Sequence, residues 1–283
     1  MSAKVVVEVE GRQLALTNLD KPLYPDGFTK GQLVDYYTRV SPVLLPHLRD
    51  RALTRVRCPD GVEGERFFEK NTPRGTPDWV RTHRVNGVAY VVADDLPTLV
   101  WLANLAAVEL HTHQWRIGGD GPDQLVVDLD PGPPATVVEC AQVALLVREH
   151  LVSLGLEPVV KTSGSKGLQV CAAAPVPDTS AFAKVLAEGL ERSHPDLVVS
   201  RMTKAVRPGK VLVDWSQNNP AKTTVTAYSL RARPRPTVST PVTWDEVEAC
   251  RDPEDLAFTS DEVLERVARH GDLLAGLLSP PGG

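Results

Sequence analysis

The sequence predicts a mixed α/β (α+β) protein built around a split βαβ sheet of the ferredoxin-like or RRM-like kind. From Gln124 to Ser200, strand-like alternation and helical periodicity follow one another in the order β-α-β-β-α-β, which defines that unit. The 283 residues are 42% hydrophobic and 24% charged, as in globular chains that bury a core. The longest apolar stretch, Leu96–Leu110, is interrupted by Asn104 and Glu109, so we expect a buried helix and no membrane contact.

The segment before residue 111 predicts an N-terminal α/β subdomain. Its expected elements are a hairpin (Lys4–Val9 with Arg12–Leu16), a helix from Thr29 to about Leu45, strands at Ala52–Val56, Arg66–Glu69 and Val88–Val92, and a core helix at Leu96–His111. Glu10-Gly11 supplies the hairpin turn, and Thr29 is a favourable helix cap. Pro42 is expected to bend or end the first helix, because proline has no backbone N–H to donate.

Residues 111–240 predict the main sheet, and residues 241–283 an acidic helical tail. The expected strands are Gln124–Leu129, Pro158–Lys161, Gly167–Ala172, Leu197–Ser200, Lys210–Ser216 and Thr223–Leu230, with helices at Pro134–Leu154 and Ser180–Ser193. The proline-rich stretch Arg231–Thr243 is linker-like and is expected to run along the surface. We therefore expect residues 1–283 to form a single domain with these three parts.

Charge is distributed unevenly along the chain. The net charge is −5, but residues 201–235 are rich in lysine and arginine and contain one acid, Asp214. Local fields steer polyanions, so a basic cleft is compatible with an acidic protein, although solvated surfaces would give the same pattern. The four cysteines lie far apart without a C-x-x-C pair, which disfavours disulfides and suits a reducing cytoplasm.

Asp128 and Asp130 stand in the stretch VVDLDP, at the end of an apolar strand. Side chains at i and i+2 of a strand share a face, so both carboxylates are expected to point to one place. A divalent cation relieves their repulsion, and carboxylate oxygens suit Mg²⁺ or Mn²⁺. The alternative is a strand end whose acids cap the next turn.

A third acid, Asp214, ends another apolar strand inside the basic segment. Three carboxylates on neighbouring strands are typical of two-metal phosphoryl or nucleotidyl transfer. The alternative for Asp214 is an ion pair with Arg207 or Lys210.

The turn TSGSKG, Thr162–Gly167, joins two expected strands of the sheet. Its glycines free backbone N–H groups to face an anion, and Ser163 and Lys166 add a hydroxyl and a cation. The sequence is therefore compatible with a phosphate-binding loop and, equally, with a plain β-hairpin turn, which explains the glycines as well.

Histidines and phenylalanines provide further candidates. His111 and His113 do not indicate zinc, because no cysteine stands nearby; a histidine beside a polyphosphate is the simpler role, and His113 is expected at the polar surface. Phe67 and Phe68 are either two core rings, or one of them faces a cleft and stacks on a nucleotide base.

Taken together, these stretches resemble the polymerase domain of bacterial ATP-dependent ligase D, a branch of the archaeo-eukaryotic primase superfamily used in non-homologous end joining. The resemblance runs from about Leu14 to Leu274 and rests on LTNLDKPLYP, FFEK, ELHTHQWR, VVDLDPG, TSGSKGL, MTKAVRPGKVLVDWSQN and KTTVTAYSLR in this order. It implies a primase-polymerase fold in which the N-terminal subdomain packs against the catalytic sheet.

The resemblance also implies roles for single residues. The catalytic, metal-binding carboxylates would be Asp128, Asp130 and Asp214. The nucleotide would be held by His111, Ser163, Lys166, Arg207, Phe67, Phe68, Arg231 and Lys222. The DNA contacts would be Asn18, Lys21 and Lys30 on a 5′-phosphate and Arg55 and Arg57 on the backbone. Val56 stands where relatives carry a basic residue, so no lysine contact to DNA is expected there.

The implied activity is nucleotidyl transfer to DNA 3′ ends at gaps or breaks, with ribonucleotides preferred over deoxyribonucleotides. The implied cofactors are two Mn²⁺ or Mg²⁺ ions, and the implied partners are nucleoside triphosphates and double-stranded DNA with gaps or broken ends. Ku and a DNA ligase are candidate partners, and we expect a monomer in the cytoplasm, at the nucleoid.

The chain is too short to hold the ligase and nuclease domains of ligase D as well, so we expect an excised domain or a free-standing relative. The alternatives are a free-standing primase-polymerase that starts chains without a primer and a non-catalytic module that bridges DNA ends. A metal phosphohydrolase is disfavoured, because the histidine-rich ligand set expected of one is missing.

Overall fold

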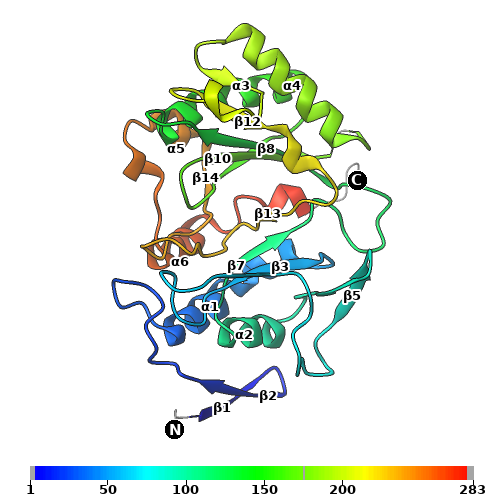
Figure 1. The fold of residues 1–283 in the computed structure, drawn as a ribbon, viewed down its shortest axis with the longest axis vertical. Coiled ribbons are helices and arrows are strands. Elements are labelled where there is room, and N and C mark those ends of the chain that lie inside the picture. The colour runs from blue at the N-terminus through cyan, green and yellow to red at the C-terminus, as the bar shows by residue number, and fades with distance from the viewer. Residues whose placement is uncertain (1–3, 175, 279–283) are drawn as a thin grey trace.

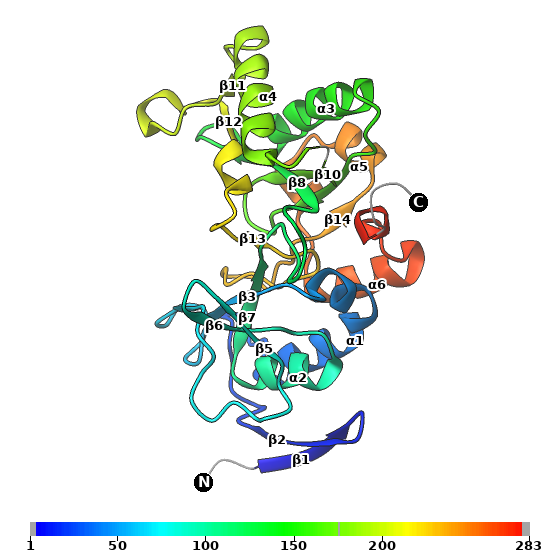
Figure 2. The same cartoon turned by 90° about the vertical axis from the view of Figure 1, so that its right-hand side faces the viewer.

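The computed structural model describes residues 4–174 and 176–278. In this part of the chain, two six-stranded sheets face each other, and helices cover the outer side of each sheet (Figure 1). Figure 2 shows the same layers from the side, with the hairpin β1–β2 (Lys4–Val9 and Arg12–Thr17) beyond the helices of the lower half. No helix in the described ranges has both the length and the hydropathy needed to cross a membrane.

The first sheet lies in the lower half of Figure 1. Its strands are β3 (Leu53–Arg57), β4 (Phe67–Glu69), β5 (Thr82–Val85), β6 (Val88–Val91), β7 (Ala107–Thr112) and β13 (Thr224–Val225). The order is β13-β7-β3-β6-β5, with β4 also paired to β3. Helices α1 (Lys30–Leu48) and α2 (Leu96–Asn104) bury their apolar faces against this sheet in one continuous core.

The second sheet carries the split βαβ unit. Its strands are β8 (Gln124–Pro131), β9 (Val159–Thr162), β10 (Leu168–Ala173), β11 (Val198–Val199), β12 (Val211–Asp214) and β14 (Pro241–Val242). The order is β11-β12-β8-β10-β9-β14, and β10 runs antiparallel to both β8 and β9. Helix α3 (Val137–Ser153) connects β8 to β9, and α4 (Thr179–Ser193) lies beside it, so the predicted unit is confirmed.

The C-terminal tail spans both halves of the molecule. Helix α5 (Trp244–Ala249) packs on α3, and α6 (Ser260–His270) packs on α1, with short 3-10 helices at Pro253–Leu256 and Ala275–Leu278. Two residues after the end of α6, the Asp272 carboxylate contacts His47 Nε2 at 2.8 Å and accepts a hydrogen bond from the Tyr228 hydroxyl at 2.7 Å. The tail thus holds the two layers together.

One predicted helix is wrong, and another is slightly longer than predicted. Leu96–His111 is not one helix: α2 ends at Asn104, Ala106 adopts a positive φ of 56°, and β7 begins at Ala107. Apolar runs of this kind do not distinguish a buried helix from a buried strand.

The first helix, α1, was predicted to run to about Leu45; it passes Pro42 and ends at Leu48. Pro42 leaves the carbonyl of Thr38 without its helical donor, and the Ser41 hydroxyl donates to that carbonyl at 2.8 Å instead. The lost backbone hydrogen bond is therefore replaced locally, and the helix can pass the proline.

The proline-rich stretch is also only partly where it was expected. Arg233 and Arg235 are exposed, but residues 238–242 are buried and include β14, which adds an edge to the second sheet. The expected strands around residues 210–216 and 223–230 are shorter than predicted: β12 ends at Asp214, and a 3-10 helix (Trp215–Asn218) follows it. Strand β5 was not predicted at all.

Candidate active site

The three predicted carboxylates meet on the inner face of the second sheet. Asp128 and Asp130 lie two residues apart on β8, and β12 runs antiparallel to β8 with Asp214 directly opposite Asp128. Residues opposite one another in a sheet share a face, as do residues at i and i+2. Ligand oxygens of all three side chains lie within 4.8 Å of one another. Their convergence therefore follows from strand register.

This cluster concentrates negative charge at the edge of the protein interior, where Asp128 and Asp214 are buried and Asp130 is exposed. Asp128 is 7% exposed. Burial, together with the charge of Asp130, raises the pKa of Asp128 well above its ordinary value. Burial and the charge of Asp214 raise the pKa of Asp130 in the same way. A divalent cation is the group that best relieves such repulsion, and a donor set made only of carboxylate oxygens suits Mg²⁺ or Mn²⁺ better than zinc.

The alternative roles of these acids are not supported. Asp214 accepts hydrogen bonds from the backbone N–H of Ser216 at 3.0 Å and from its hydroxyl at 2.5 Å. Arg207 donates to the carbonyl of Met202, and Lys210 to that of Pro195, so neither is the ion-pair partner of Asp214. The helix after β8 is capped by a threonine, not by Asp128 or Asp130.

An open cavity of about 430 Å³ lies beside the acids. Its lining includes Asp128 and Asp130 and, among the residues predicted to hold a nucleotide, His111, Ser163, Lys166, Arg207 and Arg231. These residues come from both sheets and from the loop before β12, so the cavity exists only where the two halves of the molecule meet. The structure thus brings an acidic cluster and a cationic wall together in one space.

The turn between β9 and β10 forms one wall of this cavity. Ser163 Oγ accepts hydrogen bonds from the backbone N–H groups of Ser165 and Gly167, at 3.3 and 3.1 Å. The segment is a β-hairpin turn, which is one of the two predictions made for it. Ser165 and Lys166 are exposed on this turn and line the cavity, as a phosphate-binding loop would require. Both interpretations of this turn are therefore compatible with the structure.

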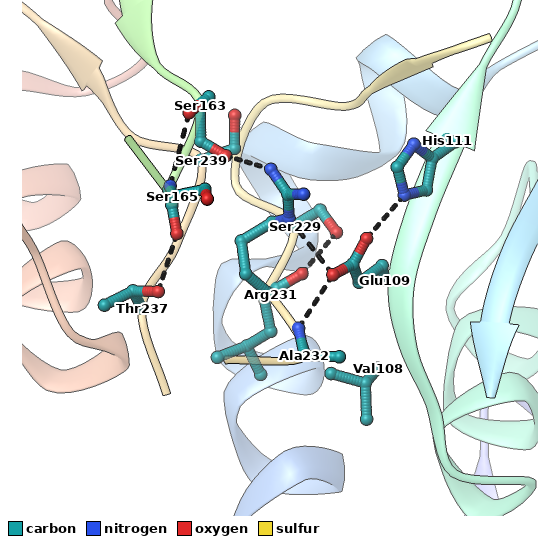
Figure 3. A network of polar contacts seen from close by, with 12 residues as sticks. Val108, Glu109, His111, Ser163, Ser165, Ser229, Arg231, Ala232, Thr237 and Ser239 are labelled. Carbon is teal, nitrogen blue, oxygen red and sulfur yellow. Dashed lines mark hydrogen bonds and ion pairs between the residues drawn. The ribbon is translucent and has the colours of Figure 1, made fainter. Parts of the chain in front are cut away.

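A buried glutamate that the sequence interpretation missed holds the opposite wall. Glu109 contacts His111 Nε2 at 2.7 Å and Arg231 Nε at 3.2 Å, and it accepts a hydrogen bond from the Ala232 N–H at 2.8 Å (Figure 3). Burial alone would raise the pKa of Glu109, but the hydrogen bond with His111 and the charge of Arg231 outweigh it and lower the pKa to about 2. Arg231 also donates to the carbonyl of Ser163, so Glu109 is linked to the turn.

The sequence carried a signal for Glu109 but none for the other missed residues. Glu109 and His111 alternate in ELHTHQ, which indicates one face of a strand, but the incorrect helix concealed this pattern. Gln169 and Gln217 also line the cavity, and no motif distinguished them from ordinary polar residues.

The aromatic pair and Lys222 lie at the edge of the site. Phe68 is 60% exposed and its ring centre lies 6.3 Å from that of His111, so it is not a core ring. Phe67, at 37% exposed, is its neighbour on the same short strand. Lys222 donates to the Ser216 hydroxyl, which in turn donates to Asp214, so Lys222 supports an acid and does not line the cavity.

The predicted 5′-phosphate group lies outside the cavity lining. Lys21 forms an ion pair with Asp60 at 2.7 Å, and its backbone N–H donates to the carbonyl of Asn18 at 3.1 Å. Lys30 is buried and donates to the carbonyl of Asn104 at 2.8 Å. Burial and the nearby charge of Lys21 lower the pKa of Lys30. These contacts place Lys21 and Lys30 near each other.

Two predicted surface roles are corrected by burial. Arg55 is 0% exposed and donates to Glu69 at 2.8 Å, and a guanidinium enclosed in this way does not reach DNA. Arg57 shares Glu69 with it but keeps part of its side chain exposed. His113 is not at the surface either: it is buried between the rings of Tyr90 and Trp115, and burial lowers its pKa.

The chain is similar to known proteins over almost its whole length. The family model described as "LigD, primase-polymerase domain" matches residues 29–274. The multifunctional non-homologous end joining protein LigD of Mycolicibacterium smegmatis is 44% identical over 277 residues, which are 94% of this chain and 36% of that protein. The bifunctional LigD of Bacillus subtilis is 32% identical, covering 92% of this chain and 43% of that protein. This chain therefore spans less than half the length of these relatives.

A solved structure agrees with these matches. The polymerase domain of Mycobacterium tuberculosis ligase D, in complex with DNA, superimposes with a TM-score of 0.88 at 42% identity and covers 95% of this chain and 99% of that chain. The fold and the family inferred from the motifs are thus confirmed. The acids, the cavity and these similarities lead to one conclusion: the chain belongs to the family of LigD primase-polymerase domains, which are nucleotidyltransferases.

Proposed function

We propose that this domain adds nucleotides to DNA 3′ ends at gaps or breaks during bacterial non-homologous end joining. The observation that carries the proposal is the convergence of three carboxylates beside a cationic cavity of about 430 Å³. A protein that only bridges DNA ends would gain nothing from three acids beside cations that contact phosphates, because acids repel phosphates.

Asp128, Asp130 and Asp214 would hold the two divalent ions. When bound, such ions activate the primer 3′-hydroxyl and stabilise the departing pyrophosphate. The protein contributes the fixed positions of the carboxylates, which the paired strands β8 and β12 set before any ligand arrives.

The cavity walls would bind the incoming nucleoside triphosphate. Lys166 and Arg207 are placed to neutralise phosphate charge, the arginine in bidentate fashion and the lysine as a point charge. Arg231 and His111 are held beside the cavity by their contacts with Glu109. Phe68 is the exposed ring nearest His111 and would stack on the base, which any nucleotide offers.

The loop before α1, through Asn18 and Lys21, and the first residue of α1, Lys30, would bind the 5′-phosphate of the downstream DNA end. Contacts to phosphate fix position without reading sequence, as a repair enzyme requires. Ribonucleotides are the preferred substrates in this proposal. The relatives described above are named as non-homologous end joining proteins. For this chain we propose Ku and a DNA ligase as partners.

A primer-extension assay on a gapped duplex with a 5′-phosphate tests the proposal. With Mn²⁺, wild-type protein is expected to incorporate nucleotides, ribonucleotides faster than deoxyribonucleotides. Asp128→Ala is expected to lower the rate at least about a hundredfold, because metal-ion stabilisation of the transition state amounts to several kcal/mol. DNA binding by this variant is expected to stay close to that of wild type.

Asp196→Ala, which removes an exposed carboxylate between α4 and β11, is the matched control and is expected to leave incorporation unchanged. Full activity of Asp128→Ala would refute the metal role. Synthesis on a template without any primer would favour a primase-polymerase, and no incorporation with either Mn²⁺ or Mg²⁺ would favour an end-bridging module.

A further inference from the structure

A row of four polar residues crosses the second sheet and includes two of the three acids. In strand register, Lys161 on β9 is opposite Gln169 on β10, Gln169 is opposite Asp128 on β8, and Asp128 is opposite Asp214 on β12. Residues opposite one another point to the same face. The row therefore begins with a cation and ends with two of the three acids.

Lys161 is a buried cation with a complete set of acceptors. It is 4% exposed, and its ammonium donates to Gln169 Oε1 at 2.5 Å, to the Val225 carbonyl at 2.9 Å and to Ser239 Oγ at 2.7 Å. Ser239 Oγ gives its own proton to the Thr162 carbonyl at 2.8 Å, so it presents a lone pair to the lysine. An ammonium has three donors, and here each has a neutral acceptor.

This arrangement fixes which way the Gln169 amide points. An ammonium only donates, so the amide oxygen of Gln169 must face Lys161. The amide nitrogen then faces the other way and donates to Asp128 Oδ1 at 2.9 Å. One oxygen of Asp128 is thereby held in place, and its other oxygen remains for a different contact.

We propose that Lys161 is a positioning residue for the metal site, acting through Gln169 to fix the carboxylate of Asp128 in the orientation that binds a divalent cation. The inference rests on the metal role proposed for Asp128 and adds two residues to it. A hydrogen bond to a ligating carboxylate raises metal affinity by limiting the orientations that the carboxylate samples. A lysine acting only through its charge would have the opposite effect, since a nearby positive charge repels a cation.

Titration of the protein alone with Mn²⁺, followed by the electron paramagnetic resonance of the free ion, tests this inference without DNA or nucleotide. Lys161→Met and Gln169→Leu are each expected to weaken Mn²⁺ binding about ten- to hundredfold. The double variant is expected to bind Mn²⁺ about as well as Gln169→Leu alone, because the lysine acts through the glutamine. If Lys161 and Gln169 had separate structural roles, the double variant would instead lose Mn²⁺ affinity by the sum of the two single effects.

Lys4→Met, at an exposed position of β1 at the other end of the molecule (Figure 1), is the control and is expected to bind Mn²⁺ as wild type does. Should Lys161→Met fail to fold, as thermal melting would reveal, Gln169→Leu still decides the matter. Unchanged Mn²⁺ binding by Gln169→Leu, or tighter binding by Lys161→Met, would overturn the inference while leaving the metal site in place. Wild-type protein that binds no Mn²⁺ would overturn the metal assignment itself.

Discussion

At the scale of single residues, the site depends on side chains that hold other side chains. Glu109 does not itself line the cavity, yet it contacts both Arg231 and His111, which do. Its carboxylate is buried and ionised, so each of its partners must stay in place to compensate the charge. Removing such a group is expected to disturb the whole wall.

Glu109→Gln is expected to lower the free energy of unfolding by about 3 kcal/mol at pH 7, because the folded-state pKa of Glu109 is about 2 against an ordinary 4.5. A depressed carboxyl pKa gives stability that is present above about pH 4.5 and is lost as the pH falls toward 2. The difference between wild type and variant should therefore shrink on acidification. Urea unfolding at pH 7 and at pH 3 measures it.

Glu149→Gln, at an exposed position of α3, should show no such difference at either pH. An equal loss of stability at pH 7 and pH 3 in Glu109→Gln would contradict the electrostatic account and indicate lost packing alone.

At the scale of elements, the turn between β9 and β10 is shaped by its neighbours. Gly164 has a φ of +65°, and a Cβ there would lie 2.6 Å from the backbone carbon of Val238 and 2.7 Å from Arg231 Cγ. Thr237 Oγ1, next to Val238 in the chain, donates to the Gly164 carbonyl at 2.7 Å. The proline-rich segment thus packs directly against the turn that carries Lys166.

Gly164→Ala is expected to lower the melting temperature and to raise the KM for nucleoside triphosphates, because the turn must move away from Val238. Gly11→Ala is the matched control: Gly11 also has a positive φ, +76°, but nothing within 4 Å of the added Cβ. Backbone strain alone amounts to about 1–2 kcal/mol in both variants. Equal melting temperatures and an unchanged KM would show that the contact with Val238 is unimportant.

At the scale of the whole molecule, the net charge is negative, but positively charged side chains are concentrated in two regions of the surface. The net charge is −5, but the cavity wall and the loop before α1 present lysines and arginines. Binding of DNA through these places is expected to weaken steeply as salt rises, since phosphate contacts release counterions.

Lys21→Ala is expected to weaken binding to a gapped duplex that carries a 5′-phosphate about tenfold at 50 mM salt, since one of the two proposed lysine contacts to the phosphate would be lost. The same variant should bind a 5′-hydroxyl duplex almost as wild type does. Fluorescence anisotropy with both duplexes measures the difference, and Lys184→Ala on α4 is the control. Equal weakening with both duplexes would place the phosphate pocket elsewhere.

The fold was predictable where local patterns are strong. The β1–β2 hairpin, the split βαβ order and the helices α3 and α4 follow from alternation, caps and turn residues, and all are confirmed. The pattern was misleading between Leu96 and His111, where a buried helix and a buried strand have the same apolar composition. It was also misleading for Arg55, because no local signal distinguishes a buried guanidinium from an exposed one.

The sequence by itself determined which residue types are present for chemistry: the carboxylates of VVDLDP and Val211–Asp214, the turn TSGSKG, and the family that their order identifies. Only the tertiary structure decided that β12 lies beside β8 with Asp214 opposite Asp128, that Glu109 holds Arg231, and that Lys161 reaches Asp128 through Gln169. The physical reason is that periodicity is a property of neighbouring residues. Strand register and burial depend instead on contacts between segments that can lie more than a hundred residues apart in the sequence.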